Sequence, residues 1–310
     1  MVCLVRFLHN EADYFSLSSE GLSSLFLRIN MSKSSLKVVG IGIQLVTHVT
    51  LQTSHAIENA DEVFYLTADD ASEEWIKRLN PKSKSLDSHY STEISRKHTY
   101  NCMVTEVLDA LQRGSNVCLV SYGHPGVFAY PMHEAVRQAK SLGYRAVMYP
   151  AISCEDVLFA DLGVDPGQGG CQTFEATDFL LYQRRFDPTS HLILLQVGVI
   201  GITALPKQVE IPNRKGLHLL SEYLFDSYKV DHQVALYEAS PFILSDARIE
   251  WFCLSDLHEI GFTAISTLYV PPVNKRSPDT NMLISLGLLD AEVHQQMQQS
   301  ESLFEAVKCL

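Results

Sequence analysis

The spacing of apolar residues along the chain changes repeatedly between two patterns from residue 36 onward. Short apolar runs that end near glycine or proline predict buried strands, and longer stretches with apolar residues three and four apart predict helices. Ser91 or Thr92 is expected to cap the clearest helix, over 93–113, and Gly114 to end it. Its apolar stripe consists of Tyr100, Met103, Val104, Val107, Leu108 and Leu111.

Strands and helices alternate in the first part of the sequence. Strands are expected over 36–43, 62–66, 116–121 and 145–149, and helices over 50–59, 75–79, 93–113 and 132–141. This order predicts an α/β fold with a mostly parallel sheet covered on both faces. A second α/β unit is expected after Pro150, with strands over 171–175, 192–197, 233–237, 250–254 and 264–270 and a helix over 217–227.

The pattern divides the chain into four parts. One α/β domain is expected over 31–150 and a second over 151–272, followed by a tail over 273–310 with a helix over 291–307. Residues 1–30 lack the compact basic start and apolar block of a signal peptide. They are either an extension that packs on the body or a segment ahead of a natural start at Met31. We favour the extension and expect it to be dispensable.

Composition and charge narrow the class of protein. The chain has 310 residues, 46% apolar and 19% charged, which excludes a disordered chain. Its 36 acidic and 24 basic side chains give a formal net charge of −12, so a nucleic-acid partner gripped through its phosphates is not expected. No apolar run approaches the roughly 18 residues of a membrane span, so no membrane partner is expected.

The seven cysteines carry no pairing or metal signal. They include no CxxC pair and no short spacing to a histidine, so neither a disulfide framework nor a metal site is expected. A reducing cytoplasm is the simplest location for such a chain.

Candidate ligand-binding loops follow the expected strands, at the sheet edge where α/β proteins usually bind ligands. Gly40-Ile-Gly42 is either a tight turn or a place where a ligand approaches the backbone, and it lacks the third glycine of a dinucleotide site. Ser121-Tyr-Gly-His-Pro-Gly-Val-Phe128 offers aromatic surfaces for a flat ring or a methylsulfonium group. Its His124 is either a ligand-binding residue or a structural hydrogen-bonding group.

A further loop, Tyr149-Pro-Ala-Ile-Ser-Cys154, leads into a helix. Ser153 can cap that helix, and the acidic pair Glu155 and Asp156 suits its positive end. The exposed amides at the same helix start can also bind a ligand. Both interpretations stay open at this point.

Tyr90, Arg96 and Tyr100 form a candidate catalytic set. Arg96 and Tyr100 are four apart on one helix face. An arginine beside a phenol favours the phenolate, which can act as a general base. Tyr100 also continues the apolar stripe, and this by itself favours a core position.

Several motifs together resemble a known family. Val39-Gly-Ile-Gly42 and Thr50-Leu-Gln-Thr-Ser-His-Ala-Ile-Glu-Asn-Ala-Asp-Glu-Val-Phe-Tyr65 look like the opening of tetrapyrrole-methylase-fold (class III) S-adenosylmethionine methyltransferases. Further segments narrow the resemblance to the borosin peptide backbone α-N-methyltransferases. The resemblance covers residues 36–272, with the motifs in the same order along the chain as in that family. They are the segments 122–128 and 150–162, Thr173-Phe-Glu-Ala-Thr-Asp-Phe179, Leu195-Gln-Val-Gly198 and Ser266-Thr-Leu-Tyr-Val-Pro-Pro272.

The resemblance implies a tetrapyrrole-methylase-like fold of two domains, with S-adenosylmethionine in the cleft between them and S-adenosylhomocysteine as product. The family's catalytic tyrosine–arginine–tyrosine set falls on Tyr90, Arg96 and Tyr100 without a gap, and no metal is implied. Family contacts to the cofactor fall on Tyr122, His124, Val127, Phe128, Ser153, Cys154, Gln196, Ala239, Ser266 and Thr267, with Tyr237 as a neighbour.

The implied reaction is methylation of backbone amides in a ribosomally made precursor peptide. Tyr100 is expected to accept the amide proton with help from Arg96, and Tyr90 to hydrogen-bond the neighbouring carbonyl. Asp87 stands where some relatives carry a further tyrosine, so this sequence offers no third phenol at that position.

The sequence departs from fused members of that family, which carry their substrate at the C-terminus. Residues 292–310 are polar and glutamine-rich, without a run of valine, isoleucine and glycine. We therefore expect the split arrangement, in which a homodimer binds a separate precursor peptide in trans, as a dimer of enzyme–precursor pairs. The alternatives are another substrate for the same fold, a small molecule or a protein, and an idle peptide-binding subunit.

Overall fold

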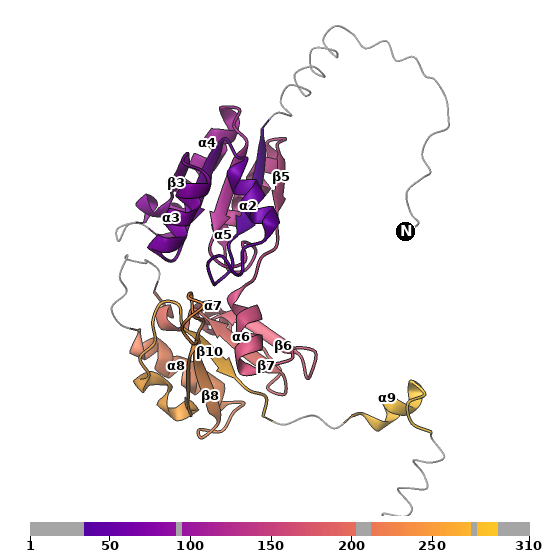
Figure 1. Cartoon of the computed structure of the whole chain (residues 1–310). Helices are drawn as coiled ribbons and strands as arrows, with labels where there is room; N and C mark the ends of the chain where they lie inside the picture. The colour runs from indigo at the N-terminus through magenta and orange to yellow at the C-terminus, as the bar shows by residue number, and fades with distance from the viewer. Residues whose placement is uncertain (1–33, 91–94, 203–211, 274–277, 291–310) are drawn as a thin grey trace, which may run out of the picture.

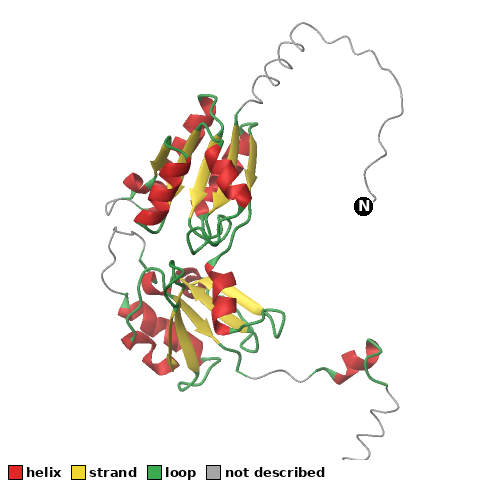
Figure 2. Ribbon diagram, in the orientation of Figure 1, coloured by secondary structure: helices red, strands yellow, loops and turns green. Residues whose placement is uncertain are grey.

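The computed structural model describes residues 34–90, 95–202, 212–273 and 278–290. The expected extension over 1–30, the expected helix over 291–307 and the expected caps Ser91 and Thr92 lie outside these residues. The described chain forms two α/β domains joined by the segment between β5 and α6 (Figure 1). Loops of the first domain face the second (Figure 2).

The first domain is built on a five-stranded parallel sheet. Its strands lie in the order β3-β2-β4-β1-β5, and every neighbouring pair is parallel, as predicted. Their bounds are β1 Ser35–Gly40, β2 Glu62–Leu66, β3 Ser83–Ser85, β4 Val117–Ser121 and β5 Arg145–Met148. Because parallel strands end at one edge, Gly40, Leu66 and Ser121 lie side by side there.

Helices cover both faces of this sheet, which confirms the predicted layering. One face packs against α4 and α5 through residues such as Met103 and Met132, and the other against α2 and α3 through Ile57 and Ile76. The helical elements are α2 Leu51–Glu58, α3 Asp70–Leu79, the 3-10 turn η2 Asp87–His89, α4 Arg96–Gln112 and α5 Tyr130–Ser141.

Several helix starts differ from the prediction, and at two of them a capping side chain shows why. The helix α4 begins at Arg96 rather than at residue 93, since the Ser95 hydroxyl accepts the backbone N–H of His98. The helix α3 begins at Asp70 rather than at residue 75, because the Asp69 carboxylate accepts the N–H of Ser72 at 2.8 Å. In both cases the capping residue, Ser95 or Asp69, fixes where the helix begins, and the spacing of apolar residues does not show that position.

The second domain contains a mixed sheet in the order β6-β7-β10-β8-β9. Only the pair β6/β7 is parallel, and the other pairs are antiparallel. Its strands are β6 Cys171–Glu175, β7 His191–Leu195, β8 Gln233–Glu238, β9 Arg248–Cys253 and β10 Thr267–Val270. A loop without a helix joins β8 to β9, so these neighbours can only run in opposite directions.

Helices and turns complete the second domain. One face of its sheet packs on α7 and α8, around Phe179 and Leu220, and the other on α6, around Leu158. These elements are α6 Cys154–Leu162, α7 Ala176–Leu181, the turns η3 Val197–Val199 and η4 Leu254–Glu259, and α8 Arg214–Phe225. The short helix α9 Thr280–Ser285 lies apart from both domains (Figure 1). Among the described helices none is long and apolar enough to cross a membrane.

Candidate active site

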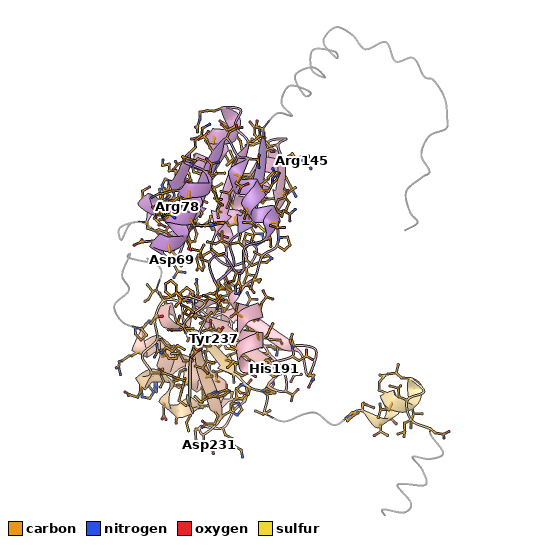
Figure 3. All side chains as sticks on the ribbon, in the orientation of Figure 1. Asp69, Arg78, Arg145, His191, Asp231 and Tyr237 are labelled. Carbon is orange, nitrogen blue, oxygen red and sulfur yellow. The ribbon has the colours of Figure 1, made fainter. Side chains whose placement is uncertain are left out.

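A pocket of about 370 Å³ is lined by residues of both domains. The first domain contributes the ends of β1, β2 and β4, and the second the ends of β7 and β8 and the start of β10. Asp69 of the first domain and Tyr237 of the second, labelled in Figure 3, both line it. The size and the mostly apolar walls with a few polar groups are typical of small-molecule sites.

Gly40 allows two loops at the sheet edge to pack together. A Cβ atom on Gly40 would lie 2.1 Å from the carbonyl oxygen of Gly123. The N–H of Gly123 donates to the Gly42 oxygen at 2.8 Å, and Gly42 has a left-handed φ of +73°. Of the two interpretations of this motif, Gly40 therefore fits the turn, because its close neighbour is protein backbone. Gly42 itself lines the pocket.

The loop after β4 presents aromatic side chains to the pocket. His124 has a structural hydrogen bond, because its Nδ1 accepts the N–H of Gly126 at 2.9 Å, while its ring lines the pocket. Tyr122 is 51% exposed because it faces the cavity, and burial by the surrounding protein still raises the pKa of its phenol. Phe128 has a φ of +52°, a strained conformation for a bulky residue, and such strain clusters at functional sites.

The start of α6 and the end of β8 form a neutral wall. Ser153 caps α6 as predicted, in a capping box with Asp156 whose carboxylate accepts the Ser153 N–H at 2.6 Å. Burial raises the pKa of the Cys154 thiol to about 11, so this thiol is protonated at neutral pH. The hydroxyl of Tyr237 donates to Asp161 at 2.8 Å, and burial raises its pKa as well.

Two phenols of the candidate catalytic set line the pocket. Tyr90 follows η2 and Tyr100 lies on α4, four residues after Arg96. The pKa of Tyr90 is raised far above its usual range, first by burial and then by Tyr100, Tyr122 and Asp87, while Arg96 opposes the shift. Tyr90 is therefore a neutral hydrogen-bond donor at any physiological pH.

Arg96 connects the two domains. Its NH1 donates to the side-chain oxygen of Gln196 at 3.4 Å, from α4 to the segment after β7. Within the described residues its Nε and NH2 are buried and have no hydrogen-bond partner, and the same holds for the hydroxyl of Ser121 in the pocket wall. Buried donors without partners are costly, so their presence here fits a polar ligand. Gln196 has a strained φ of +58°.

The structure brings most of the expected site residues to one pocket. Those that line it are Tyr90, Tyr100, Tyr122, His124, Val127, Phe128, Ser153, Cys154, Gln196, Tyr237, Ala239 and Thr267. Arg96 joins them through Gln196. Ser266 does not line the pocket, because its side chain is wholly buried and its hydroxyl donates to Glu238 at 2.5 Å. The strand β10 begins at Thr267 rather than at residue 264, and the loop before it presents Ala264 and Ile265 instead.

Sequence reasoning missed part of the lining. Leu66 and Leu195 are the last residues of β2 and β7. Their position at strand ends could have identified them as lining residues, because ligands of α/β sheets bind there. Asp69 and Ser72 belong to the cap of α3, which the predicted helix start left out. The two candidate loops named from the sequence also contribute Ile41, Gly42, Ser121 and Gly123. The remaining missed residues are Ile43, Ala68, Ala129, Pro131, Met132, Pro241, Ala264 and Ile265.

Residues 35–237 match the family model of Tetrapyrrole (Corrin/Porphyrin) Methylases. Two solved structures agree on the fold. The chain aligns with uroporphyrin-III-C-methyltransferase from Thermus thermophilus at a TM-score of 0.57 and 17% identity, covering 77% of this chain and 95% of that one. It aligns with the cobalamin biosynthetic enzyme cobalt precorrin-4 methyltransferase at a TM-score of 0.53 and 14% identity, covering 79% and 96%.

Curated relatives are fungal proteins described as a methyltransferase and a ribosomally synthesised peptide precursor in one. A type I borosin cyclic peptide precursor of Coprinopsis marcescibilis is 39% identical over 269 residues, covering 84% of this chain and 69% of the relative. The omphalotin A precursor of Omphalotus olearius is 38% identical over 261 residues, covering 83% and 62%. A type III borosin precursor of Anomoporia bombycina is 38% identical over 269 residues, covering 86% and 31%.

This chain thus spans from about a third to about two thirds of the length of these three relatives. The family model, the two-domain fold and the identity to these relatives agree with the resemblance seen in the motifs. The chain belongs to the borosin methyltransferases of the tetrapyrrole methylase family.

Proposed function

We propose that the chain transfers methyl groups from S-adenosylmethionine to backbone amide nitrogens of a peptide. The observation that carries the proposal is the meeting of Tyr90, Tyr100 and the Arg96–Gln196 link at one interdomain pocket. The neutral phenol of Tyr90 supplies a hydrogen-bond donor, and the phenol of Tyr100 in the same pocket supplies a base. The other walls consist of aromatic and strand-end residues that can enclose a cofactor.

The chemistry needs a base because an amide nitrogen is a poor nucleophile. Its lone pair is delocalised into the carbonyl group, so methyl transfer requires loss of the N–H proton or stabilisation of the imidate form. Tyr100, which lines the pocket, accepts that proton. Tyr90 donates a hydrogen bond to the amide oxygen, on which negative charge develops as the proton leaves. The high pKa of Tyr90 keeps it in the donating form.

The cofactor would lie against the aromatic loop after β4 and the end of β7. Tyr122, His124 and Phe128 give ring faces for the adenosyl and sulfonium parts, and Gln196 and the amides at the start of α6 give polar contacts. The unpartnered hydroxyl of Ser121 suits a polar group of the same ligand. When bound, S-adenosylmethionine supplies an electrophilic methyl group. Holding nitrogen and methyl carbon together in the pocket adds a proximity effect of several kcal/mol, about 7–11 at most.

We propose further that the peptide comes from a separate precursor, bound in trans by a homodimer. In support, the described part of the C-terminal segment, α9, lies away from the pocket and does not line it. The pocket is therefore open to a second polypeptide as far as the described residues go.

Methyl transfer to a peptide added in trans is the direct test. We expect a synthetic peptide rich in valine, isoleucine and glycine, incubated with the full chain and S-adenosylmethionine carrying a deuterated methyl group, to gain label on backbone nitrogens. Tandem mass spectrometry locates the label, and a reaction without the cofactor is the control. Label on side chains, or a stable complex without label, would contradict the proposal. Native mass spectrometry of the same mixture measures the stoichiometry.

Arg96→Met is expected to lower turnover, because it removes the guanidinium group that joins α4 to Gln196 of the second domain. Arg96→Lys keeps the positive charge and should restore part of the wild-type rate. The measurement is the initial rate of methyl transfer at saturating cofactor. A wild-type rate for Arg96→Met would count against a role for this link in the reaction.

A further inference from the structure

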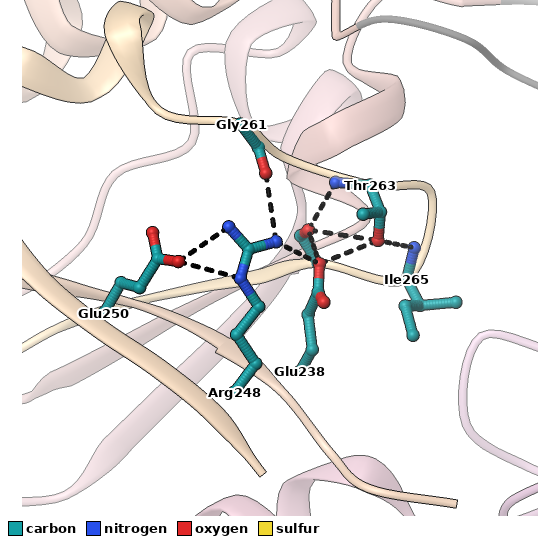
Figure 4. Close-up of polar contacts among 7 residues, drawn as sticks. Glu238, Arg248, Glu250, Gly261, Thr263 and Ile265 are labelled. Atoms are coloured by element: carbon teal, nitrogen blue, oxygen red, sulfur yellow. Dashed lines mark hydrogen bonds and ion pairs between the residues drawn. The ribbon is translucent and has the colours of Figure 1, made fainter.

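Glu238 gathers hydroxyl and guanidinium donors just behind the pocket. It is the last residue of β8, and its side chain is 12% exposed. Its Oε1 accepts hydrogen bonds from Thr263 Oγ1 at 2.7 Å, Ser266 Oγ at 2.5 Å and Arg248 NH1 at 3.4 Å (Figure 4). Hydrogen bonds to a charged acceptor are stronger than neutral ones, and removal of a buried acceptor leaves its donors unsatisfied.

Two of these donors belong to one turn at the pocket wall. The N–H of Thr263 donates to Ser266 Oγ at 2.7 Å, and the N–H of Ser266 donates to the Thr263 oxygen at 3.2 Å. Between them lie Ala264 and Ile265, which line the pocket. The segment 263–266 has no helix or strand to hold it. Its shape therefore depends on the hydroxyl groups and on the carboxylate that accepts from both.

The turn also packs against the segment that carries Gln196. The N–H of Val197 donates to the Ser266 oxygen at 3.2 Å. A Cβ atom on Gly198 would lie 1.8 Å from the Thr263 oxygen, so the two backbones touch there. A displacement of the turn would thus reach Gln196 and, through it, Arg96.

Arg248 holds the other side of the same network. Its Nε and NH2 donate to Glu250 at 2.9 and 2.8 Å, and its NH1 donates to the Gly261 oxygen at 3.1 Å as well as to Glu238 (Figure 4). Glu250 touches Arg248 but no residue of the turn in these contacts. It is therefore a matched control for the loss of one carboxylate.

We propose that Glu238 is a positioning residue that fixes the turn 263–266 against the pocket and so sets the affinity for the cofactor. The inference rests on the proposed function for the identity of that cofactor. The predicted effect of Glu238→Ala is a faster exchange of the amides over 263–266 and at least tenfold weaker binding of S-adenosylhomocysteine. Glu238→Gln keeps an acceptor of the same size and should recover most of the affinity.

Calorimetric titration with S-adenosylhomocysteine and hydrogen–deuterium exchange test this inference. Glu250→Gln is expected to bind within about twofold of wild type, and exchange over β7 shows whether Glu238→Ala is folded. Should that variant fail to fold, Thr263→Val removes one donor to Glu238 and is expected to loosen the same turn. Wild-type affinity and exchange in Glu238→Ala, or in Thr263→Val in its place, would overturn the inference. Failure of the wild-type chain to bind S-adenosylhomocysteine would count against the proposed function, while exchange over 263–266 would still decide the role of Glu238.

Discussion

Tyr100→Phe should reduce turnover by roughly 10²–10⁴-fold and leave the affinity for S-adenosylhomocysteine within about twofold of wild type, because the substitution removes only the proposed proton acceptor. The ring is retained, so its packing in the core of the first domain and its contact with Tyr130, at 6.0 Å between ring centroids, stay in place. Single-turnover rates of peptide methylation and calorimetric titration separate the two effects.

Tyr130→Phe is the matched control for this substitution. Tyr130 neighbours Tyr100 but is 42% exposed and does not line the pocket. We expect it to methylate peptide at the wild-type rate. Activity retained by Tyr100→Phe would remove Tyr100 as the base, and a loss of cofactor affinity would assign it a binding role instead.

Gly40→Ala is expected to destabilise the first domain by about 1–3 kcal/mol and to weaken cofactor binding together with it. The added Cβ would lie 2.1 Å from the Gly123 oxygen and 2.8 Å from the Ala151 Cβ, and neither is the flexible end of a long side chain. The loop after β4 must therefore move away from β1, and this loop carries Tyr122, His124 and Phe128. Denaturant unfolding and S-adenosylhomocysteine titration measure the two losses.

Gly261→Ala controls for the general effect of replacing a glycine. A Cβ atom on Gly261 meets nothing within 4 Å, and its backbone does not need the left-handed region. The free energy of unfolding of Gly261→Ala should equal or slightly exceed that of the wild type. Equal unfolding midpoints for Gly40→Ala and wild type would show that the two loops can separate without cost.

The first domain could be predicted from sequence because each of its layers has its own pattern. Buried parallel strands appear as continuous apolar runs, such as the one at Val117–Ser121, and α4 shows its core stripe. The mixed sheet of the second domain was harder to predict. Strand direction there depends on how short loops turn, and an apolar run such as Gln233–Glu238 looks the same in either direction.

The candidate site was only partly visible in the sequence. Strand-end loops and the spacing of Tyr90, Arg96 and Tyr100 pointed to the correct side of the first sheet. The hydrogen bond between Arg96 and Gln196 joins residues 100 positions apart in two domains, and no local pattern encodes it. The expectation that Ser266 lies in the pocket wall was wrong for a related reason. The residue at which β10 starts decides which residues of the preceding loop face the pocket, and Ser266 faces Glu238 instead.

The left-handed backbone at Gln196 and Phe128 lowers the stability of the fold, while the side chains of the same two residues form part of the pocket. Each non-glycine residue in this conformation costs about 1–3 kcal/mol that glycine would not. Selection for heat resistance alone would therefore favour glycine at both positions. The same change would remove the partner of Arg96 and one aromatic wall of the pocket. Directed evolution of this protein for thermal stability should therefore keep Gln196 and Phe128 unchanged and seek stabilising substitutions elsewhere.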